Sequence, residues 1–315
     1  MTDAPLLAAR DLVVRYGQVE AVHGISLEVR PGEVVGLIGP DGAGKTSTLR
    51  VLGGLQKATE GQATAFGSDC WKSRRALHTR LGYLAQRFAL YTDLTVNENI
   101  QFFALMYGVP RWKERRRELL ELVGLAPFHD RLADRLSGGM KQKLALACTL
   151  IHSPEALLLD EPTTGVDPVT RREFWRLLAD LVNDGLTLFV ATPYLDEAER
   201  CTRVLLMHEG SLLADSRPQE IPGMMPGTIL EVTATPRAAA ADILASQEGV
   251  ADVSVFGTTL HVHLEGMQHS AESIQQVLGI EGIEVERIDV VTAGLEDAFL
   301  YLTRSSENRM SMEAS

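Results

Sequence analysis

The segment over residues 33–55 constrains the fold of this chain more than any other part of it. Its apolar run over residues 33–38 (EVVGLI) is typical of a strand that is buried on both faces. A glycine-rich loop follows directly, and a helical pattern begins at Lys45. A strand, a glycine-rich loop and a helix in this order present free backbone N–H groups at a helix N-terminus, where anions bind. The segment therefore predicts an α/β domain with a phosphate site at the end of a central strand.

The loop itself satisfies every position of the pattern G-x-x-x-x-G-K-S/T. Its residues are Gly39, Pro40, Asp41, Gly42, Ala43, Gly44, Lys45 and Thr46. The glycines allow backbone N–H groups to close around phosphates, and Lys45 adds a compact positive charge. The Thr46 hydroxyl can ligate Mg²⁺. The alternative is an ordinary glycine-rich turn between a strand and a helix. Such a turn has no reason to match all eight positions of the pattern directly after a buried strand.

A second glycine-containing segment narrows the class of phosphate-binding protein. Ser137, Gly138 and Gly139 precede a helical pattern that we expect to start at Met140, which predicts another anion-binding helix N-terminus. By itself this string could be a plain helix cap. Further along, the apolar run over residues 156–159 ends in Asp160-Glu161-Pro162-Thr163. In this order, the segments resemble the nucleotide-binding domain of ABC transporters, over about residues 6–222.

The resemblance implies a role for each matching residue. Gln86, Lys45 and Glu161 would be catalytic, with Glu161 orienting or deprotonating the attacking water and Gln86 approaching both that water and the metal. Thr46, Gln86 and Asp160 would hold Mg²⁺. Tyr16 would stack on adenine, although a strand tyrosine packed on the core is the alternative. The full ATP-binding set that the resemblance implies is Tyr16, Gly39, Pro40, Asp41, Gly42, Ala43, Gly44, Lys45, Thr46, Ser47, Ser137, Gly138 and Gly139.

The resemblance also implies that one chain makes only half of each site. In the family, two domains enclose ATP head to tail, so that the phosphate loop of one faces the Ser137–Gly139 segment of the other. Residues 165–167 (GVD) match the loop that crosses between the two. We therefore expect a homodimer or a pairing with a second ABC ATPase.

Two positions depart from the family pattern. Asp41 stands where asparagine is common, which brings a carboxylate near the phosphates. Alignment on Asp196, Glu197 and Ala198 places Pro193 where the family usually has a histidine that contacts the γ-phosphate. Proline has no side-chain donor or acceptor. This departure raises the alternative of a subunit that binds ATP but scarcely hydrolyses it, as the regulatory half of a heterodimer.

Composition and patterning divide the chain into two domains. Residues 223–315 carry 14 Asp and Glu against four Arg and no Lys, so they hold most of the net charge of −12. A stretch rich in Pro, Gly and Met over residues 221–227 marks the change. We predict an ABC cassette over residues 1–222 with a helical insertion at about 87–150. A ferredoxin-like α+β domain would follow over 223–305, and a disordered tail over 306–315.

The remaining expectations concern partners and location. No apolar run reaches the length of about 18 residues that a membrane helix needs, so the permease would be a separate chain, contacted by residues 87–98. Without a recognisable secretion signal, we expect a cytoplasmic subunit, peripheral on the inner face of the membrane. The acidic balance argues against nucleic acid. Residues 94–99, 191–199 and 295–300 resemble prokaryotic drug and polymer exporters, and a soluble ABC ATPase is the remaining alternative.

Overall fold

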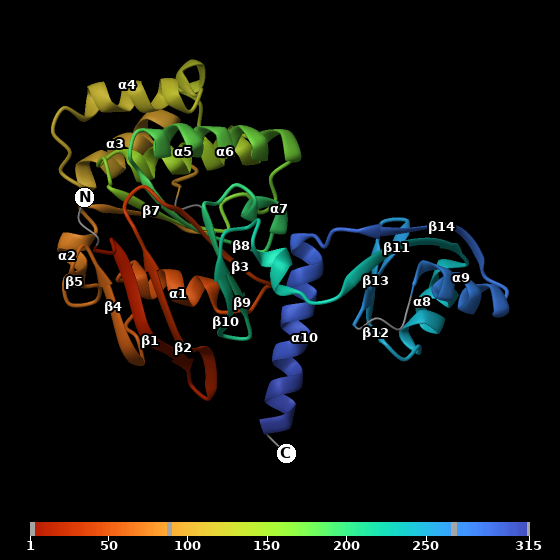
Figure 1. Ribbon diagram of the computed structural model, residues 1–315. Coiled ribbons are helices and arrows are strands. Elements are labelled where there is room, and N and C mark those ends of the chain that lie inside the picture. Colours follow the sequence, from red (N-terminus) through yellow and green to blue (C-terminus); the bar gives the residue numbers. More distant parts are fainter. Residues whose placement is uncertain (1–3, 87–89, 266–269, 314–315) are drawn as a thin grey trace. The chain divides into compact units, whose positions relative to one another are not determined.

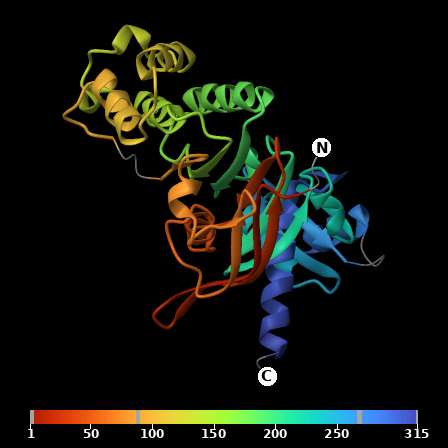
Figure 2. The same cartoon turned by 90° about the vertical axis from the view of Figure 1, so that its left-hand side faces the viewer.

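The chain forms two compact units, Met1–Ser216 and Arg217–Ser315. The computed structural model describes residues 4–86, 90–265 and 270–313, with side chains to residue 306 (Figures 1 and 2). The sequence predicts a domain boundary at residue 222, whereas the first unit ends a few residues earlier, at Ser216. The chain leaves the first unit at the end of a strand, and the Pro- and Gly-rich stretch already belongs to the second.

The centre of the first unit is a six-stranded sheet in the order β10-β9-β3-β8-β7-β6. All neighbouring pairs are parallel except β9 with β10. Every residue of β3, β7 and β8 is buried, as expected for strands covered on both faces. The strands are β3 (Val34–Ile38), β6 (Leu81–Leu84), β7 (Ala156–Asp160), β8 (Thr187–Thr192), β9 (Arg203–His208) and β10 (Ser211–Ser216).

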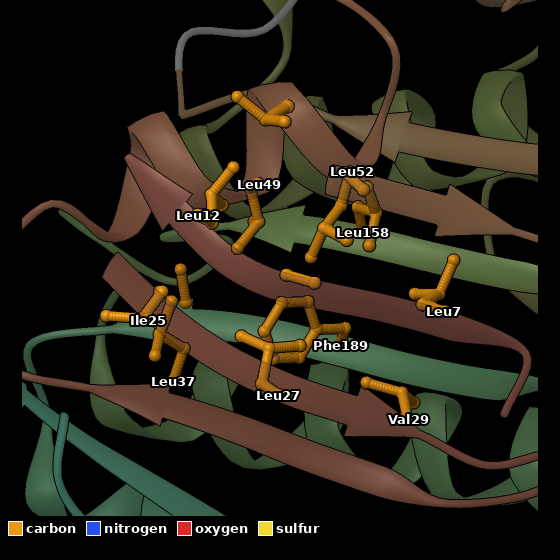
Figure 3. Close-up of a cluster of buried hydrophobic side chains, with 14 of the residues drawn as sticks. Leu7, Leu12, Ile25, Leu27, Val29, Leu37, Leu49, Leu52, Leu158 and Phe189 are labelled. Atoms are coloured by element: carbon orange, nitrogen blue, oxygen red, sulfur yellow. The ribbon is translucent and has the colours of Figure 1, made fainter. Parts of the chain in front are cut away.

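A second, antiparallel sheet in the order β2-β1-β4-β5 belongs to the same unit. Its strands are β1 (Leu7–Tyr16), β2 (Val19–Val29), β4 (Glu60–Ala65) and β5 (Ser68–Asp69), and the helices α1 (Lys45–Leu52) and α2 (Arg74–Leu77) accompany them. Side chains from both sheets and from α1 form one apolar core, in which Leu12, Leu49 and Phe189 take part (Figure 3). This core fixes the start of α1 relative to the end of β3, and so fixes the loop between them.

The segment between β6 and β7 is helical, as predicted. It contains α3 (Val96–Met106), α4 (Trp112–Leu122), the short 3-10 helices η1 (Ala126–Phe128) and η2 (Ala133–Arg135), and α5 (Gly138–Leu150). Figures 1 and 2 show α3 to α5, in yellow to light green, gathered on one side of the first unit. Two further helices, α6 (Pro168–Asn183) and α7 (Leu195–Ala198), follow β7 and β8. Of the segment 87–98 that the sequence assigns to permease contact, residues 87–89 lie outside the described residues.

The second unit has the predicted ferredoxin-like order of elements. After the 3-10 helix η3 (Ile221–Met224) come β11 (Thr228–Thr235), α8 (Arg237–Ala245), β12 (Val250–Phe256), β13 (Thr259–Leu264), α9 (Ala271–Ile280), β14 (Glu284–Val291) and α10 (Leu295–Glu313). The strands pair antiparallel in the order β12-β13-β11-β14, which is the arrangement expected of a βαββαβ chain. One face of this sheet packs with α8 and α9 around a separate apolar cluster.

The prediction of a disordered tail from residue 306 is wrong for residues 306–313. Helix α10 continues to Glu313, because no Gly or Pro interrupts the sequence after Leu295. The first turn also carries Glu296 and Asp297, whose charges favour a helix N-terminus. Across the part of the chain that the structure describes, no helix is long and apolar enough to span a bilayer.

Candidate phosphate-binding and catalytic site

The glycines of the loop between β3 and α1 are required by its backbone. Gly44 is the residue before α1 and has φ 101°, a conformation that other residues rarely adopt. A Cβ on Gly44 would lie 2.3 Å from the carbonyl oxygen of Ala21, and one on Gly39 would lie 2.0 Å from that of Met207. The loop therefore packs against β2 and β9 as closely as backbone allows. Its path is fixed by the surrounding strands.

Lys45 lies inside this loop with only 3% of its surface exposed. Its Nζ donates hydrogen bonds to the carbonyl oxygens of Gly39 and Pro40, both at 2.8 Å. The Oε1 atom of Glu161 lies 3.9 Å away. Burial lowers the pKa of Lys45, while the negative charges of Glu161, Asp41 and Asp160 act in the opposite direction. A cation is thus held at the centre of the glycine loop, where phosphate oxygens would approach.

Thr46 and Asp160 meet at the end of β7, although 114 positions separate them. The Thr46 hydroxyl donates to Oδ1 of Asp160 at 2.8 Å, and the Tyr83 hydroxyl donates to Oδ2 at 3.0 Å. Burial is the main reason that the pKa of Tyr83 is raised, and the Asp160 charge adds to it. A hydroxyl and a carboxylate are oxygen ligands of the kind that Mg²⁺ prefers. Tyr83 was not among the predicted site residues, because a tyrosine in a short strand carries no sequence signal.

Glu161 has a backbone conformation that points to a functional placement. Its φ is 48°, in the left-handed region, which costs about 1–2 kcal/mol for a residue with a side chain. Its N–H donates to the Ala191 carbonyl oxygen at 2.8 Å, which holds it beside β8. Its Oε2 accepts hydrogen bonds from Gln86 Nε2 at 2.7 Å and from the Thr164 hydroxyl at 3.2 Å. Gln86, Lys45 and Glu161 therefore converge as the sequence indicated, and Thr164 joins them.

Tyr16 presents an aromatic ring to solvent near the start of α1. It is 46% exposed, so the alternative of a tyrosine packed into the core does not describe it. Its hydroxyl donates to Gln56 Oε1 at 2.7 Å and lies 3.2 Å from the Ser47 Oγ. An exposed ring held at its hydroxyl end is suited to stacking on a flat aromatic base.

The Ser137 segment forms the start of α5. Ser137 Oγ accepts a hydrogen bond from Met140 N at 3.3 Å, and the helix begins at Gly138 rather than at Met140. A Cβ on Gly139 would lie 2.3 Å from Thr170 Cγ2, so this glycine allows α5 to approach α6. Ser137 and Gly138 are exposed. Among the described residues, no hydrogen bond or ion pair joins this segment to the glycine loop.

Position 193 lies at the same edge of the sheet as the two carboxylates. The last residue of β8, Thr192, is in register with Ile38 of β3, and Ala191 is in register with Asp160 of β7. Pro193 follows directly, so the departure from the family pattern falls beside the glycine loop. Asp41, the other departure, is exposed.

The geometry as a whole can bind a polyphosphate with a divalent cation and activate a water molecule. The carboxyl ends of parallel strands meet at one edge, which is where α/β proteins bind ligands. At this edge the buried Lys45 lies 3.9 Å from the Glu161 carboxylate, and Thr46 and Asp160 form a hydroxyl–carboxylate pair. These are the groups that phosphoryl transfer to water requires.

Comparison with known proteins agrees with this chemistry. A family model described as ABC transporter matches residues 22–164. The probable multidrug ABC transporter ATP-binding protein YbhF of Escherichia coli (strain K12) is 42% identical over 287 residues, covering 90% of this chain and 49% of that protein. The chain thus spans about half the length of that relative. The daunorubicin resistance ATP-binding protein DrrA2 of Streptomyces coeruleorubidus is 34% identical over 320 residues, covering 99% of each chain.

Among solved structures, the chain resembles a dimeric bacterial ABC transporter cassette. The TM-score is 0.62 at 26% identity, and the match covers 67% of this chain and 98% of the cassette. The remaining third of this chain therefore has no counterpart in that structure.

Proposed function

The chain belongs to the family of ABC transporter ATP-binding proteins, and from that membership we propose that it hydrolyses ATP to drive export through a separate membrane permease. The observation that carries the proposal is the convergence of Lys45, Gln86 and Glu161 beside the Thr46–Asp160 pair. Lys45 and the loop would hold the terminal phosphates. Thr46, Gln86 and Asp160 would hold Mg²⁺, which would neutralise phosphate charge.

Glu161 is the residue that we assign to the attacking water. Its carboxylate faces Lys45 and is oriented by two side-chain donors, so its direction is fixed before a substrate arrives. A pre-oriented acceptor lowers the barrier, because no reorganisation is needed in the transition state. Tyr16 would stack on the adenine ring, which completes the part of the ATP site that one chain supplies.

A second copy or a second ABC ATPase would supply the Ser137–Gly139 segment. Ser137 and Gly138 are exposed at the start of a 13-residue helix, whose N-terminal N–H groups attract anions. Since nothing described joins them to the loop of their own chain, we assign them to the γ-phosphate of a nucleotide bound by the partner. The dimeric form of the related cassette supports this assembly.

The permease contact would lie on the helical insertion. Tyr91, Phe102, Leu105 and Met106 are all large apolar side chains with at least 38% of their surface exposed. Tyr91 and Phe102 also touch, with ring centroids 4.6 Å apart. Grouped exposure of this kind is typical of a protein-interaction surface. We assign this surface to a membrane permease, which would hold the subunit on the inner face of the membrane.

Export is the direction we propose, because two relatives that match most of this chain are described as multidrug and daunorubicin resistance proteins. The second unit would act as an appendage that stabilises the dimer or regulates the cassette. It carries no recognisable motif for a ligand of its own.

The decisive experiment compares the ATPase activity of the wild-type protein with that of Glu161→Gln. We expect the variant to lose at least about 100-fold in kcat, because the acceptor for the water proton is removed while the shape is kept. It should retain ATP binding and accumulate as an ATP-bound dimer in light scattering. Glu121→Gln, an exposed change on α4, serves as the matched control.

The alternative outcome is equally clear. If wild-type activity does not exceed that of Glu161→Gln, even with the permease present, the chain is a nucleotide-binding module. Pro193 would then account for the loss, since it removes a donor at the γ-phosphate edge.

A further inference from the structure

Glu197 is a fully buried carboxylate that has no part in the site described above. It lies in α7 with no exposed surface. Its Oε1 accepts hydrogen bonds from the hydroxyl of Thr163 and from Trp175 Nε1, the latter at 3.0 Å. Arg171 Nε lies 3.9 Å from the same oxygen. Three side chains that are distant from Glu197 in sequence thus gather around one atom.

Burial of this carboxylate is costly, so its presence calls for a reason. An ionised group removed from water loses hydration that only good partners restore. Here the partners serve one oxygen, and no described residue forms a hydrogen bond to Oε2. An apolar side chain of similar volume would avoid that cost. The carboxylate therefore fits a role in holding particular groups in place better than a role in stability.

One of the groups held by Glu197, Thr163, lies in the loop that carries the catalytic carboxylate. Thr163 directly precedes Thr164, whose hydroxyl donates to Glu161 Oε2 at 3.2 Å. Glu197 itself lies a few residues after Pro193, in α7, which the turn after β8 leads into. The contact between Thr163 and Glu197 therefore ties the loop that carries Glu161 to the turn that carries Pro193.

A second tie joins the same turn to α6. The Arg171 guanidinium lies 4.1 Å from the centre of the Tyr194 ring, and its Nη1 lies 3.5 Å from Asp196 Oδ2. Arg171 and Trp175 are one turn apart on α6, so both face α7. Because Pro193 has no polar side chain, the position of its turn is set by these neighbours on either side of it.

We propose that Glu197 is a positioning residue that keeps the Glu161–Thr164 loop and the turn after β8 in one fixed relation. This inference rests on the proposed hydrolysis of ATP. Glu197 has no exposed surface, so it is not placed to contact the nucleotide directly. It acts through Thr163, which fixes the loop on which Glu161 and Thr164 are mounted.

The test measures kcat and KM for ATP in the full-length protein carrying Glu197→Met, which removes the oxygen that accepts from Thr163 and Trp175. Glu199→Met, an exposed change at the end of α7, is the matched control. Glu197→Met should lower kcat by about 10-fold, because the loop that carries Glu161 loses its tie and small displacements of a catalytic group reduce rate strongly. KM for ATP should stay within about threefold of the wild-type value, since the glycine loop and Lys45 are untouched. A structural defect alone would instead lower the folded fraction and leave the kcat of the folded molecules unchanged.

A second pair of variants covers the case in which Glu197→Met does not fold. Thr163→Val keeps the shape of Thr163 and removes the hydroxyl, whereas Thr163→Ser keeps the hydroxyl. We expect Thr163→Val to show the same fall in kcat and Thr163→Ser to stay close to wild type. Equal kcat values in Thr163→Val, Thr163→Ser and the wild type would overturn the inference.

The two failures are distinguishable in this design. If the wild type hydrolyses ATP faster than Glu161→Gln but Thr163→Val and every folded Glu197 variant retain full kcat, only the positioning role is wrong. If the wild type does not exceed Glu161→Gln, the proposed function fails and the positioning role fails with it.

Discussion

The two units of the chain use their sheets in opposite ways. In the first, β3, β7 and β8 are parallel and buried along their whole length, so neither face is available to a ligand. Its polar side chains gather where the strands end. In the second, the antiparallel strand β11 alternates, with Leu230 and Val232 in the apolar cluster and Glu231 half-buried on the other face. In the second unit, polar side chains therefore lie along one face of the sheet.

That polar face carries the start of α10. Asp297 accepts hydrogen bonds from Gly294 N at 2.7 Å and, at 2.8 Å, from His261 Nδ1. The ring of Tyr301 meets that of His263 edge to face, with centroids 5.4 Å apart. Parallel strands buried on both sides can offer only their ends to chemistry, whereas an antiparallel sheet can also attach a helix to its polar face. We therefore ask whether a change in one unit affects ATP hydrolysis or stability in the other.

The largest expected effect is that of Lys45→Ala on ATP hydrolysis. Removal of the buried cation should lower kcat/KM by at least about 100-fold, because the charge that stabilises the terminal phosphates is lost. Lys57→Ala, an exposed change shortly after α1, is the control. Steady-state phosphate release gives the measurement. If Asp297→Ala, a change in the second unit, lowered kcat/KM for ATP hydrolysis by a similar factor, the two units would not be separate in catalysis.

Core truncations should destabilise each unit separately. Leu158→Ala and Leu230→Ala each remove a buried leucine and should each cost about 2–5 kcal/mol in the unit concerned. All three tryptophans and all three cysteines belong to the first unit. Tryptophan fluorescence during denaturation should therefore shift in Leu158→Ala and stay in place in Leu230→Ala, while circular dichroism reports both.

The rate of cysteine labelling gives a second measurement of the stability of the first unit in Leu158→Ala and Leu230→Ala. Burial raises the pKa of the Cys70 and Cys201 thiols to about 12 and that of Cys148 as well. All three should react slowly in the folded protein, because the thiolate is the reactive form. Faster labelling in Leu230→Ala than in the wild type would contradict independence.

The smallest expected effect concerns the attachment of α10. Asp297→Ala should destabilise the second unit by about 1–3 kcal/mol, because His261 and the Gly294 N–H lose a buried acceptor. Glu296→Ala, the exposed neighbour, should change stability far less. Hydrogen exchange of the amides in residues 295–305 gives the measurement. Unchanged exchange in Asp297→Ala would mean that apolar contacts alone hold the helix.

The sequence was informative where local chemistry determines structure. The glycine loop needs particular residues at consecutive positions, and Asp160 and Glu161 follow a strand whose burial is visible in its composition. The order of elements in the second unit was also predictable, because strand-like and helical patterns follow one another and are separated by turns. None of this required knowledge of contacts between distant segments.

What the sequence did not reveal depends on such contacts. Tyr83 bonds to Asp160 across neighbouring strands, and Glu197 reaches Thr163 and Trp175 from two other segments. The partners of a single tyrosine or glutamate in a distant segment cannot be predicted from the sequence around it. The sequence predicts too short a helix for α10. Its apolar residues become sparse after residue 303, which suggests disorder, although no Gly or Pro ends the helix there.

The separation of Ser137 from the glycine loop has a genetic consequence. If two copies assemble as proposed, each composite site takes its loop from one gene product and its Ser137 segment from the other. A cell that makes one version damaged at Lys45 and another damaged at Ser137 would still build mixed pairs with one intact site. Two alleles that are each inactive alone could thereby complement one another, and Glu161→Gln made beside the wild type would act as a dominant inhibitor.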